Sequence, residues 1–333
     1  MNENYFRILQ SLSETFSEIS QNGFPAAVLQ PAIQSNSWFT EYYIQTAWTK
    51  MGNWHTEIAL TQFLAHYSGF VLPPTPLRIG IIGAGNIPFV AWHDILMTVL
   101  SGNTAIVKLS RQDNHLIPYW VEKWAEKLPE IQTRIQFTEK VENPDFLIVT
   151  GSDNTARQLE YGYKDIPKIV RRHRFSVALW RGNPAELPQL CEEVLLYNGL
   201  GCRSVSVLFI PDFSFLPEIA DAFRLYPESQ LSQNYLEKKR FEEARLQMLN
   251  VEYTNAKTVL LVPETSPNPK GISILSVSIL SQYPAFQARF SEQLQCISGK
   301  DCALGFSQNP QIDDFADGID TFQRLIEINT SRQ

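Results

Sequence analysis

The stretch LRIGIIGAGNIPF, residues 77–89, is the part of the sequence that decides the fold class. It follows a proline-rich segment, residues 73–76, which interrupts regular structure and marks a boundary. Its first half is a short apolar run that predicts a buried β-strand over residues 77–82. Gly83 and Gly85 come directly afterwards and predict a tight turn at the end of that strand.

Downstream of this stretch, short apolar runs alternate with segments of helical periodicity. The predicted strands and helices are, in chain order, residues 77–82, 88–101, 104–107, 114–127, 146–149, 153–162, 176–179 and 185–197. Continuous apolar strands separated by helices are typical of a buried parallel sheet with helices on both faces. Such sheets bind ligands at the carboxyl ends of their strands, so the pattern predicts an α/β fold with a nucleotide-binding lobe.

The flanking regions predict helices before this lobe and a second lobe after it. Three-to-four spacing of apolar residues predicts a helix from Phe6 to Ile19 and another from about Thr56 to Tyr67, with Ile58, Leu60, Phe63 and Leu64 inward. After Ser204 the rhythm is less regular, and the predicted strands, charged helix and terminal helix are residues 205–209, 258–262, 272–277, 233–248 and 315–328. We expect an N-terminal helical segment and nucleotide-binding domain over residues 1–198, rejoined by residues 300–333, and a catalytic domain over residues 199–299.

Composition and charge exclude several functional classes. The 333 residues are 44% hydrophobic and 19% charged, which is the balance of a folded protein and not of a disordered chain. A chain of this length favours two lobes over one. The net charge is -7, and the densest basic cluster, residues 171–174, is short. We therefore expect this cluster to form a solvated turn, and we expect no nucleic-acid or anionic-membrane partner.

Targeting, membrane and metal signals are also missing from the sequence. The first residues show no basic segment followed by an apolar stretch, and no apolar run reaches the roughly 18 residues of a membrane span. The cysteines, Cys191, Cys202, Cys296 and Cys302, have no Cys-x-x-Cys spacing and favour thiols in a reducing cytoplasm. The histidines form no His-x-x-x-His pair, so no metal site is predicted.

The glycine turn is an incomplete dinucleotide fingerprint. Gly83 and Gly85 begin the pattern G-x-G-x-x-G, but Pro88 occupies the third glycine position. That glycine lets helix and strand pack closely, so its replacement weakens the ordinary Rossmann interpretation. Pro88 suits the first turn of a helix, and Asn86 just before it suits an N-cap.

Further motifs follow the glycine turn in a fixed order. Residues 86–89 are Asn-Ile-Pro-Phe, residues 102–110 are Gly-Asn-Thr-Ala-Ile-Val-Lys-Leu-Ser, and residues 150–152 are Thr-Gly-Ser. In this order they resemble the aldehyde dehydrogenase superfamily, whose members place an Asn-x-Pro helix start ahead of a Gly-Asn-x-x-x-x-Lys-x-Ser strand end. Cys202 then follows the next helix, as the catalytic cysteine of that superfamily does.

Two more stretches resemble the LuxC-like acyl-CoA reductases within that superfamily. Residues 199–206, Gly-Leu-Gly-Cys-Arg-Ser-Val-Ser, are similar to the cysteine loop of this family. Residues 315–321, Phe-Ala-Asp-Gly-Ile-Asp-Thr, resemble its Tyr-Ala-Asp-Gly-Val-Asp-Thr stretch. The resemblance covers residues 77–328 and implies an aldehyde-dehydrogenase-like fold with a parallel-sheet nucleotide-binding lobe and a smaller α/β catalytic lobe.

The resemblance implies NADPH-dependent reduction of an acyl-CoA, or another acyl thioester, to the aldehyde through an acyl-Cys202 intermediate. A thiolate attacks a thioester readily and leaves readily, which suits such a covalent relay. The neighbouring Arg203 favours the thiolate. Taken alone, a cysteine near a strand is interpreted as a small buried residue, and this interpretation is kept for Cys191, Cys296 and Cys302.

The resemblance also assigns an oxyanion donor and a cofactor site. Asn86 matches the residue whose amide faces the developing negative oxygen, with helix capping as the alternative role. Gly151 and Ser152 precede a predicted helix whose N-terminus suits the cofactor pyrophosphate, and Ser152 also suits an N-cap.

Lys108 and Ser110 match the superfamily motif at the cofactor's adenosine ribose. Members that prefer NAD often carry Glu at the place of Arg111, and a cation there favours a 2′-phosphate. NADPH is therefore the expected cofactor, with a solvated surface residue as the alternative for Arg111.

One departure from the superfamily narrows the reaction. Hydrolytic members carry a general-base Glu in a Glu-Leu-Gly-Gly-Lys-Ser stretch, whereas residues 171–176 here, Arg-Arg-His-Arg-Phe-Ser, contain none. Exchange between thioester and aldehyde needs no activated water, so reduction is favoured over oxidation to the free acid. His173 is either an acid–base group or a surface residue. Asn198 stands one residue closer to Cys202 than in many members and receives no role.

Two other functions stay open on the sequence. A catalytically degenerate relative would bind nucleotide or acyl-CoA, or dock to a partner enzyme such as an acyl transferase, without an activated cysteine. An ordinary Rossmann dehydrogenase would use Gly83 and Gly85 with no covalent step. The chain is shorter than typical aldehyde dehydrogenases. If it forms a homo-oligomer, we expect the surface between subunits to be altered or smaller than in those proteins.

Overall fold

The computed structural model describes residues 3–67, 69–151 and 153–331 and divides the chain into two compact units. Unit 1 comprises residues 1–36, 44–173 and 311–333, and unit 2 comprises residues 37–43 and 174–310. The expected boundary lies between residues 198 and 199, whereas the chain enters unit 2 at Arg174. The physical reason is strand pairing, because the strand that follows Arg174 pairs within the second sheet.

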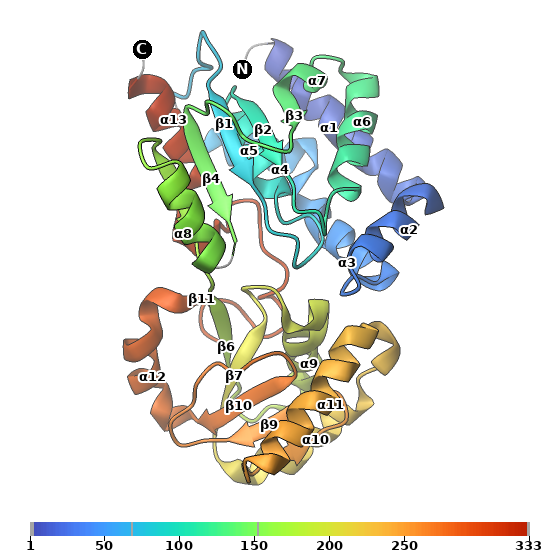
Figure 1. The fold of residues 1–333 in the computed structure, drawn as a ribbon, viewed down its shortest axis with the longest axis vertical. Coiled ribbons are helices and arrows are strands. Elements are labelled where there is room, and N and C mark those ends of the chain that lie inside the picture. Colours follow the sequence, from blue (N-terminus) through green and yellow to red (C-terminus); the bar gives the residue numbers. More distant parts are fainter. Residues whose placement is uncertain (1–2, 68, 152, 332–333) are drawn as a thin grey trace. The chain divides into compact units, whose positions relative to one another are not determined.

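Unit 1 is built on a five-stranded parallel sheet in the order β3-β2-β1-β4-β5 (Figure 1). Its strands are β1 (Arg78–Ile82), β2 (Thr104–Lys108), β3 (Ile135–Phe137), β4 (Phe146–Thr150) and β5 (Lys168–Arg171). The chain first moves from β1 toward β3 and then returns to add β4 on the other side of β1. The carboxyl ends of β1 and β4 therefore flank the switch point where sheets of this kind bind ligands.

Helices cover both faces of this sheet. Right-handed crossovers place α5 (Trp92–Leu100) and α6 (Leu116–Lys127) on one face and α8 (Asp153–Gly162) on the other (Figure 1). Under α8, Leu147 and Val149 pack with Leu159. The remaining helices of this half of the chain are α1 (Glu3–Asn22), α2 (Ala26–Ser35), α3 (Glu41–Met51), α4 (Glu57–Ala65), α7 (Ile131–Arg134) and α13 (Thr321–Ser331).

An aromatic cluster attaches the N-terminal helices to the sheet's outer helices. Phe16 of α1 stacks on Trp48 of α3 with ring centroids 4.2 Å apart, and Trp92 stacks on Trp120 at 3.5 Å. Trp48 meets Trp120 edge-on at 4.6 Å, which joins the two pairs. Large buried rings contribute both apolar area and specific ring geometry, so this cluster fixes the helices to unit 1.

Unit 2 is built on a mixed six-stranded sheet in the order β11-β6-β7-β10-β9-β8. The strands are β6 (Phe175–Leu179), β7 (Val205–Ile210), β8 (Thr254–Asn255), β9 (Leu260–Pro263), β10 (Ile274–Ile279) and β11 (Leu294–Ser298), and only β8 is antiparallel to its neighbour. One face packs against α9 (Leu187–Leu195), α10 (Leu216–Leu225) and α11 (Gln233–Met248), and the other against α12 (Tyr283–Phe290) (Figure 1).

The predicted strands and long helices are all present, with shifted ends. The sequence analysis did not predict the short strands β3, β5, β8 and β11 or the helices α2, α3, α7, α10 and α12. The helix expected over residues 88–101 begins only at Trp92, because residues 88–91 form a turn. Ile58 was expected inward but is 71% exposed, since α4 turns Leu60, Phe63 and Leu64 toward the core instead.

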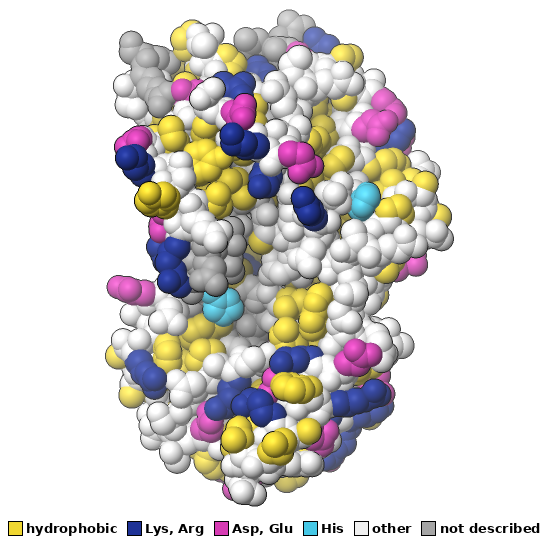
Figure 2. Space-filling view, viewed as in Figure 1, with side chains coloured by type: hydrophobic (Ala, Val, Ile, Leu, Met, Phe, Trp, Pro, Cys, Tyr) yellow, Lys and Arg dark blue, Asp and Glu magenta, His cyan; other side chains and the backbone are white. Residues whose placement is uncertain are grey.

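The distribution of surface charge and the lengths of the helices can be compared with those of nucleic-acid-binding and membrane-spanning proteins. Over the face drawn in Figure 2, Lys and Arg side chains lie in small groups interspersed with Asp and Glu. This mixture differs from the basic stripe that marks a nucleic-acid footprint. Among the described residues, every helix is too short or too polar to cross a membrane.

Candidate active site

The turn after β1 lies against the turn after β2 in unit 1. A Cβ on Gly85 would come within 2.6 Å of the Ser110 Oγ, and a Cβ on Gly83 within 2.8 Å of the Ala91 Cβ. Both positions therefore require glycine for close packing rather than for an unusual backbone angle. Asn36 donates from Nδ2 to the Gly85 carbonyl at 2.8 Å, which fixes the glycine turn from the N-terminal side.

A buried carboxyl group joins the same two turns. Asp113 is 3% exposed, and its Oδ2 accepts a hydrogen bond from the Phe89 amide at 2.9 Å. Phe89 has a φ of 63°, a strained value for an aromatic residue, so this bond holds a backbone conformation that costs energy. The other oxygen, Oδ1, has no hydrogen-bond partner among the described residues. Burial raises the pKa of Asp113 to about 7 despite the bond from Phe89.

Asn86 lies in this turn and is exposed. It does not cap the following helix, because α5 begins at Trp92 and its N-cap residue is Ala91. The capping alternative for Asn86 is therefore removed, and Pro88 likewise stands before the helix rather than in its first turn.

The structure brings the other candidate cofactor residues to the carboxyl edge of the same sheet. Lys108 is the last residue of β2 and is exposed, as is Arg111, whereas Ser110 is half-buried against Gly85. Gly151 follows β4 and donates from its amide to the Arg171 carbonyl at 3.5 Å. Ser152 lies outside the described residues.

Arg171 does not belong to a solvated turn. It is the last residue of β5 and is 6% exposed, and its guanidinium pairs with Asp94 of α5 at 2.5 Å. It also donates to the Thr321 Oγ1 at 2.8 Å, so it ties the start of α13 to the sheet. The next two residues, Arg172 and His173, are exposed as expected.

Cys202 lies in unit 2 at the tip of a tight turn that leads into the central strand β7. The Ser204 amide donates to the Gly201 carbonyl at 3.0 Å, which places Cys202 and Arg203 at the two central positions. The Ser176 Oγ donates to the Cys202 carbonyl at 3.0 Å and fixes the turn to the start of β6. Cys202 is an exposed residue.

Asn198 holds the strained backbone that precedes this turn. Tyr197, Asn198 and Gly199 all have φ between 55° and 68°, a left-handed run that only specific contacts can maintain. The Asn198 amide nitrogen donates to the Trp38 carbonyl at 2.9 Å. Its oxygen accepts from the Tyr43 hydroxyl at 3.2 Å and from the Ser232 amide and hydroxyl at 3.0 and 3.1 Å. Sequence reasoning assigned Asn198 no role, although an Asn ahead of a glycine is a signal for left-handed backbone.

Glu193 stabilises the Cys202 turn indirectly, through the segment that contains Ser307 and Gln308. This fully buried carboxylate of α9 accepts from the Ser298 hydroxyl at 2.8 Å and from the Ser307 amide at 2.9 Å. The segment it anchors then holds the turn, because the Gln308 amide donates to the Ser204 Oγ at 3.1 Å. A single buried Glu gives no periodic signal, which is why the sequence did not reveal it.

The other cysteines differ from Cys202 in exposure. Cys191 is buried in the main core of unit 2, and burial raises the pKa of its thiol to about 12. Cys296 is buried in β11 and Cys302 is half-buried, with their sulfurs 3.6 Å apart. Only Cys202 is exposed among the four.

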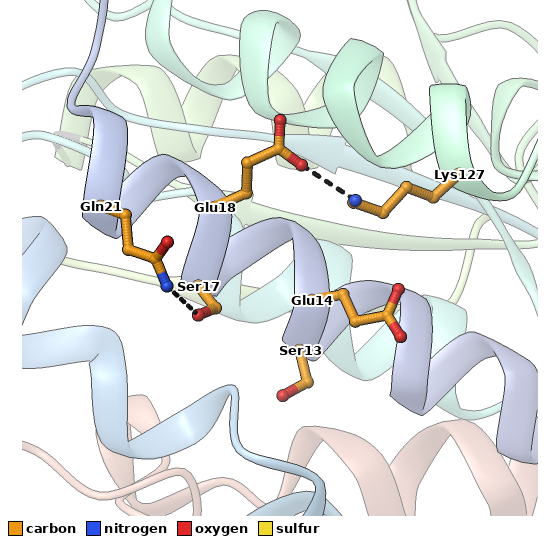
Figure 3. A pocket seen from close by; sticks show the side chains of 6 residues that line it. All are labelled: Ser13, Glu14, Ser17, Glu18, Gln21 and Lys127. Carbon is orange, nitrogen blue, oxygen red and sulfur yellow. Dashed lines mark hydrogen bonds and ion pairs between the residues drawn. The ribbon is translucent and has the colours of Figure 1, made fainter.

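One surface pocket does not involve these residues. It lies along α1 and is lined by Ser13, Glu14, Ser17, Glu18, Gln21 and Lys127 (Figure 3). The ion pair between Glu18 and Lys127, at 2.9 Å, and the bond from Gln21 to Ser17 occupy its polar groups. We interpret it as a shallow groove between exposed side chains.

The comparisons with known proteins support the fold. No family model and no curated protein matches the sequence. Among solved structures, an NAD-dependent aldehyde dehydrogenase from Sinorhizobium meliloti matches with a TM-score of 0.64 and 13% identity, over 88% of this chain and 68% of that one. Aldehyde dehydrogenase 21 from Physcomitrella patens, in complex with the reaction product succinate, matches with a TM-score of 0.64 and 9% identity. This match covers 95% of this chain and 79% of that one.

A third match has a cofactor in its crystal structure. It is a glyceraldehyde-3-phosphate dehydrogenase from Methanocaldococcus jannaschii complexed with NADP, with a TM-score of 0.63, 9% identity and coverage of 84% of this chain and 72% of that one. The expectation of an aldehyde-dehydrogenase-like α/β fold is thus confirmed.

Proposed function

We propose that this chain reduces an acyl-CoA, or another acyl thioester, to the aldehyde through a covalent acyl-Cys202 intermediate, as the resemblance to LuxC-like reductases implies. The observation that carries the proposal is the exposed position of Cys202 at the tip of a braced turn in an aldehyde-dehydrogenase-like fold. A reactive cysteine has to be accessible, whereas a structural one is normally buried.

The residues of the chain divide the chemistry between them. The Cys202 thiolate attacks the thioester carbonyl, the coenzyme A thiolate leaves, and the acyl group remains on Cys202. The amide of Asn86 is the proposed donor to the oxyanion, together with the Cys202 backbone amide. One such donor contributes roughly a hundred- to thousandfold in rate. Cys202 then departs as a thiolate when the reduced intermediate collapses to the aldehyde.

The edge of unit 1 fits a dinucleotide. The glycine turn presents backbone at the switch point of the parallel sheet, where a Cβ on Gly85 would collide with Ser110. Lys108 and Arg111 are exposed cations at the end of β2 and would hold a 2′-phosphate, which favours NADPH over NADH. Gly151 and Ser152 would face the pyrophosphate at the start of α8. When bound, the cofactor supplies hydride to the acyl group.

The missing general base supports reduction over hydrolysis. The segment 171–176, which runs from the last residue of β5 into β6, contains neither Glu nor Asp. Its first residue, Arg171, is committed to the ion pair with Asp94. An acyl group on Cys202 would therefore meet no carboxylate from this segment to activate water.

The test is acylation followed by turnover. Incubation with a panel of acyl-CoAs should add one acyl mass to the intact protein, and addition of NADPH should then remove it with loss of nicotinamide absorbance. Cys202→Ser should show neither, whereas the buried-cysteine control Cys191→Ser should show both. Nicotinamide oxidation by Cys202→Ser at the wild-type rate would contradict the covalent mechanism. Binding of acyl-CoA by the wild type with no acyl-enzyme would favour the degenerate binding protein.

A further inference from the structure

A pair of thiols lies apart from Cys202 in unit 2. Cys296 is 5% exposed within β11, and Cys302 is half-buried, with a distance of 3.6 Å between the two Sγ atoms. This distance is a thiol–thiol hydrogen bond, and a disulfide requires about 2.05 Å. The pair has no part in the function proposed above and needs its own explanation.

The turn between the two cysteines holds the sulfurs together. The Gly299 amide donates to the Cys302 carbonyl at 2.8 Å, and the Ile297 amide donates to the Asp301 carboxylate at 2.9 Å. Gly299 has a φ of 81°, and a Cβ there would come within 2.4 Å of the Leu179 carbonyl oxygen. The turn that brings the two cysteines together is therefore fixed by its own hydrogen bonds.

The two sulfurs are chemically unequal. The hydrogen bond between the two thiols lowers the pKa of Cys302 and raises the pKa of Cys296. The positive charge of Arg203 favours the thiolate at both sulfurs, while the negative charges of Glu193 near Cys302 and Asp301 near Cys296 oppose it. Cys302 is also the more exposed of the two, so it is the thiol that a small oxidant meets first.

We propose that Cys296 and Cys302 form a redox-active dithiol that small peroxides convert to an intramolecular disulfide. The Cys302 thiolate attacks one peroxide oxygen, the O–O bond breaks, and hydroxide leaves, which makes Cys302 a sulfenic acid. The Cys296 sulfur then attacks the Cys302 sulfur, the S–O bond breaks, and the Cys296 proton leaves with the departing oxygen as water. With hydrogen peroxide, the leaving hydroxide takes up the proton that Cys302 lost on ionising, so the two thiols lose two electrons in total and one H2O2 becomes two waters. An alkyl hydroperoxide would give an alcohol and one water instead.

The experiment is peptide mapping of the full chain after limited hydrogen peroxide. Trypsin cleaves after Lys300, which lies between the two cysteines, so a disulfide would join two otherwise separate tryptic peptides. We expect these linked peptides in the wild type, loss of two hydrogen atoms from the intact mass, and full reversal by a dithiol reductant. Cys302→Ser should abolish the linkage, and Cys296→Ser should leave a sulfenic acid on Cys302 that dimedone traps.

Cys202→Ser removes the exposed thiol as a competing target and should leave the linkage intact, as should Cys191→Ser. Wild-type protein that gains oxygen atoms on Cys302 without linked peptides would overturn the proposal, and so would a disulfide that joins Cys202 to either cysteine. Because the readout is covalent structure, a negative result here is independent of whether the chain reduces acyl thioesters.

Discussion

The buried ion pair between Asp94 and Arg171 allows a quantitative test of how unit 1 is held together. The Asp94 and Arg171 side chains are 3% and 7% exposed, and the pair connects α5 to the end of β5 at 2.5 Å. Asp94→Ala leaves the guanidinium buried without its counter-charge, which costs about 3–5 kcal/mol. The next residue supplies a matched control, since Arg172 pairs with Glu160 at 2.9 Å and the two side chains are 50% and 37% exposed. Glu160→Ala should cost at most about 1 kcal/mol.

Urea unfolding followed by tryptophan fluorescence reports mainly on unit 1, which contains Trp48, Trp54, Trp92, Trp120 and Trp124. With a urea dependence of about 2 kcal/mol/M, the midpoint should fall by about 1.5–2.5 M in Asp94→Ala and by less than about 0.5 M in Glu160→Ala. Replacing both partners, Asp94→Leu with Arg171→Met, should recover most of the loss, because no charge is then left buried. Equal midpoints for the two single variants would refute the reasoning.

Three further predictions address the two turns and the cofactor edge. Arg111→Ala should raise the KM for NADPH about tenfold, which is the low end of the effect expected for one charge-assisted hydrogen bond, and should leave the KM for NADH nearly unchanged. Equal effects on both KM values would show that Arg111 does not bind the 2′-phosphate. Asn198→Ala should destabilise unit 2 by about 3 kcal/mol, because it strands the Trp38 carbonyl and the Ser232 amide, and hydrogen exchange should rise in residues 198–204 and not in β1. Asp113 has a pKa of about 7 in the folded chain against 3.8 as its ordinary value, so its protonated form stabilises unit 1 at low pH and this stability is lost as the pH rises toward 7. The difference in unfolding free energy between wild type and Asp113→Asn should therefore change by up to about 4 kcal/mol between pH 4 and pH 8, and a pH-independent difference would show that Asp113 titrates normally.

The sequence predicted the parallel sheet of unit 1 well, because a strand buried on both faces is a continuous apolar run. β1, β2 and β4 all have this character. Four of the five residues of β1 and of β4 are buried, and β2 has three buried residues before the exposed Lys108. β3 and β5 were missed since they are edge strands with polar residues on one side, as Gln136 and Lys168 show. A polar edge strand has neither a long apolar run nor a clean alternation over enough residues to be recognised.

The candidate site shows the same division between local and long-range information. Cys202, Asn86 and Lys108 lie in local motifs and could therefore be proposed from the sequence. Glu193 and Arg171 act through partners more than 70 positions away in the chain, so no spacing rule could reveal them. Their burial reverses the ordinary expectation for charged residues, and only the tertiary structure supplies the compensating partners.

The buried polar groups of unit 2 converge on one piece of backbone, and this explains why the fold retains them. Ser176 and Gln308 bond to the segment 198–204, and Asn198 connects the start of that segment to Trp38 and Ser232. Glu193 in turn holds Ser307, the residue next to Gln308. A buried polar network stabilises little compared with an apolar core of the same size, but it permits one arrangement and penalises the others. A nucleophile benefits from such a support because small displacements cost much of its reactivity. The left-handed backbone at Tyr197 and Asn198 is the strained part of this segment, and under the proposed mechanism the segment would hold the Cys202 thiol in one position.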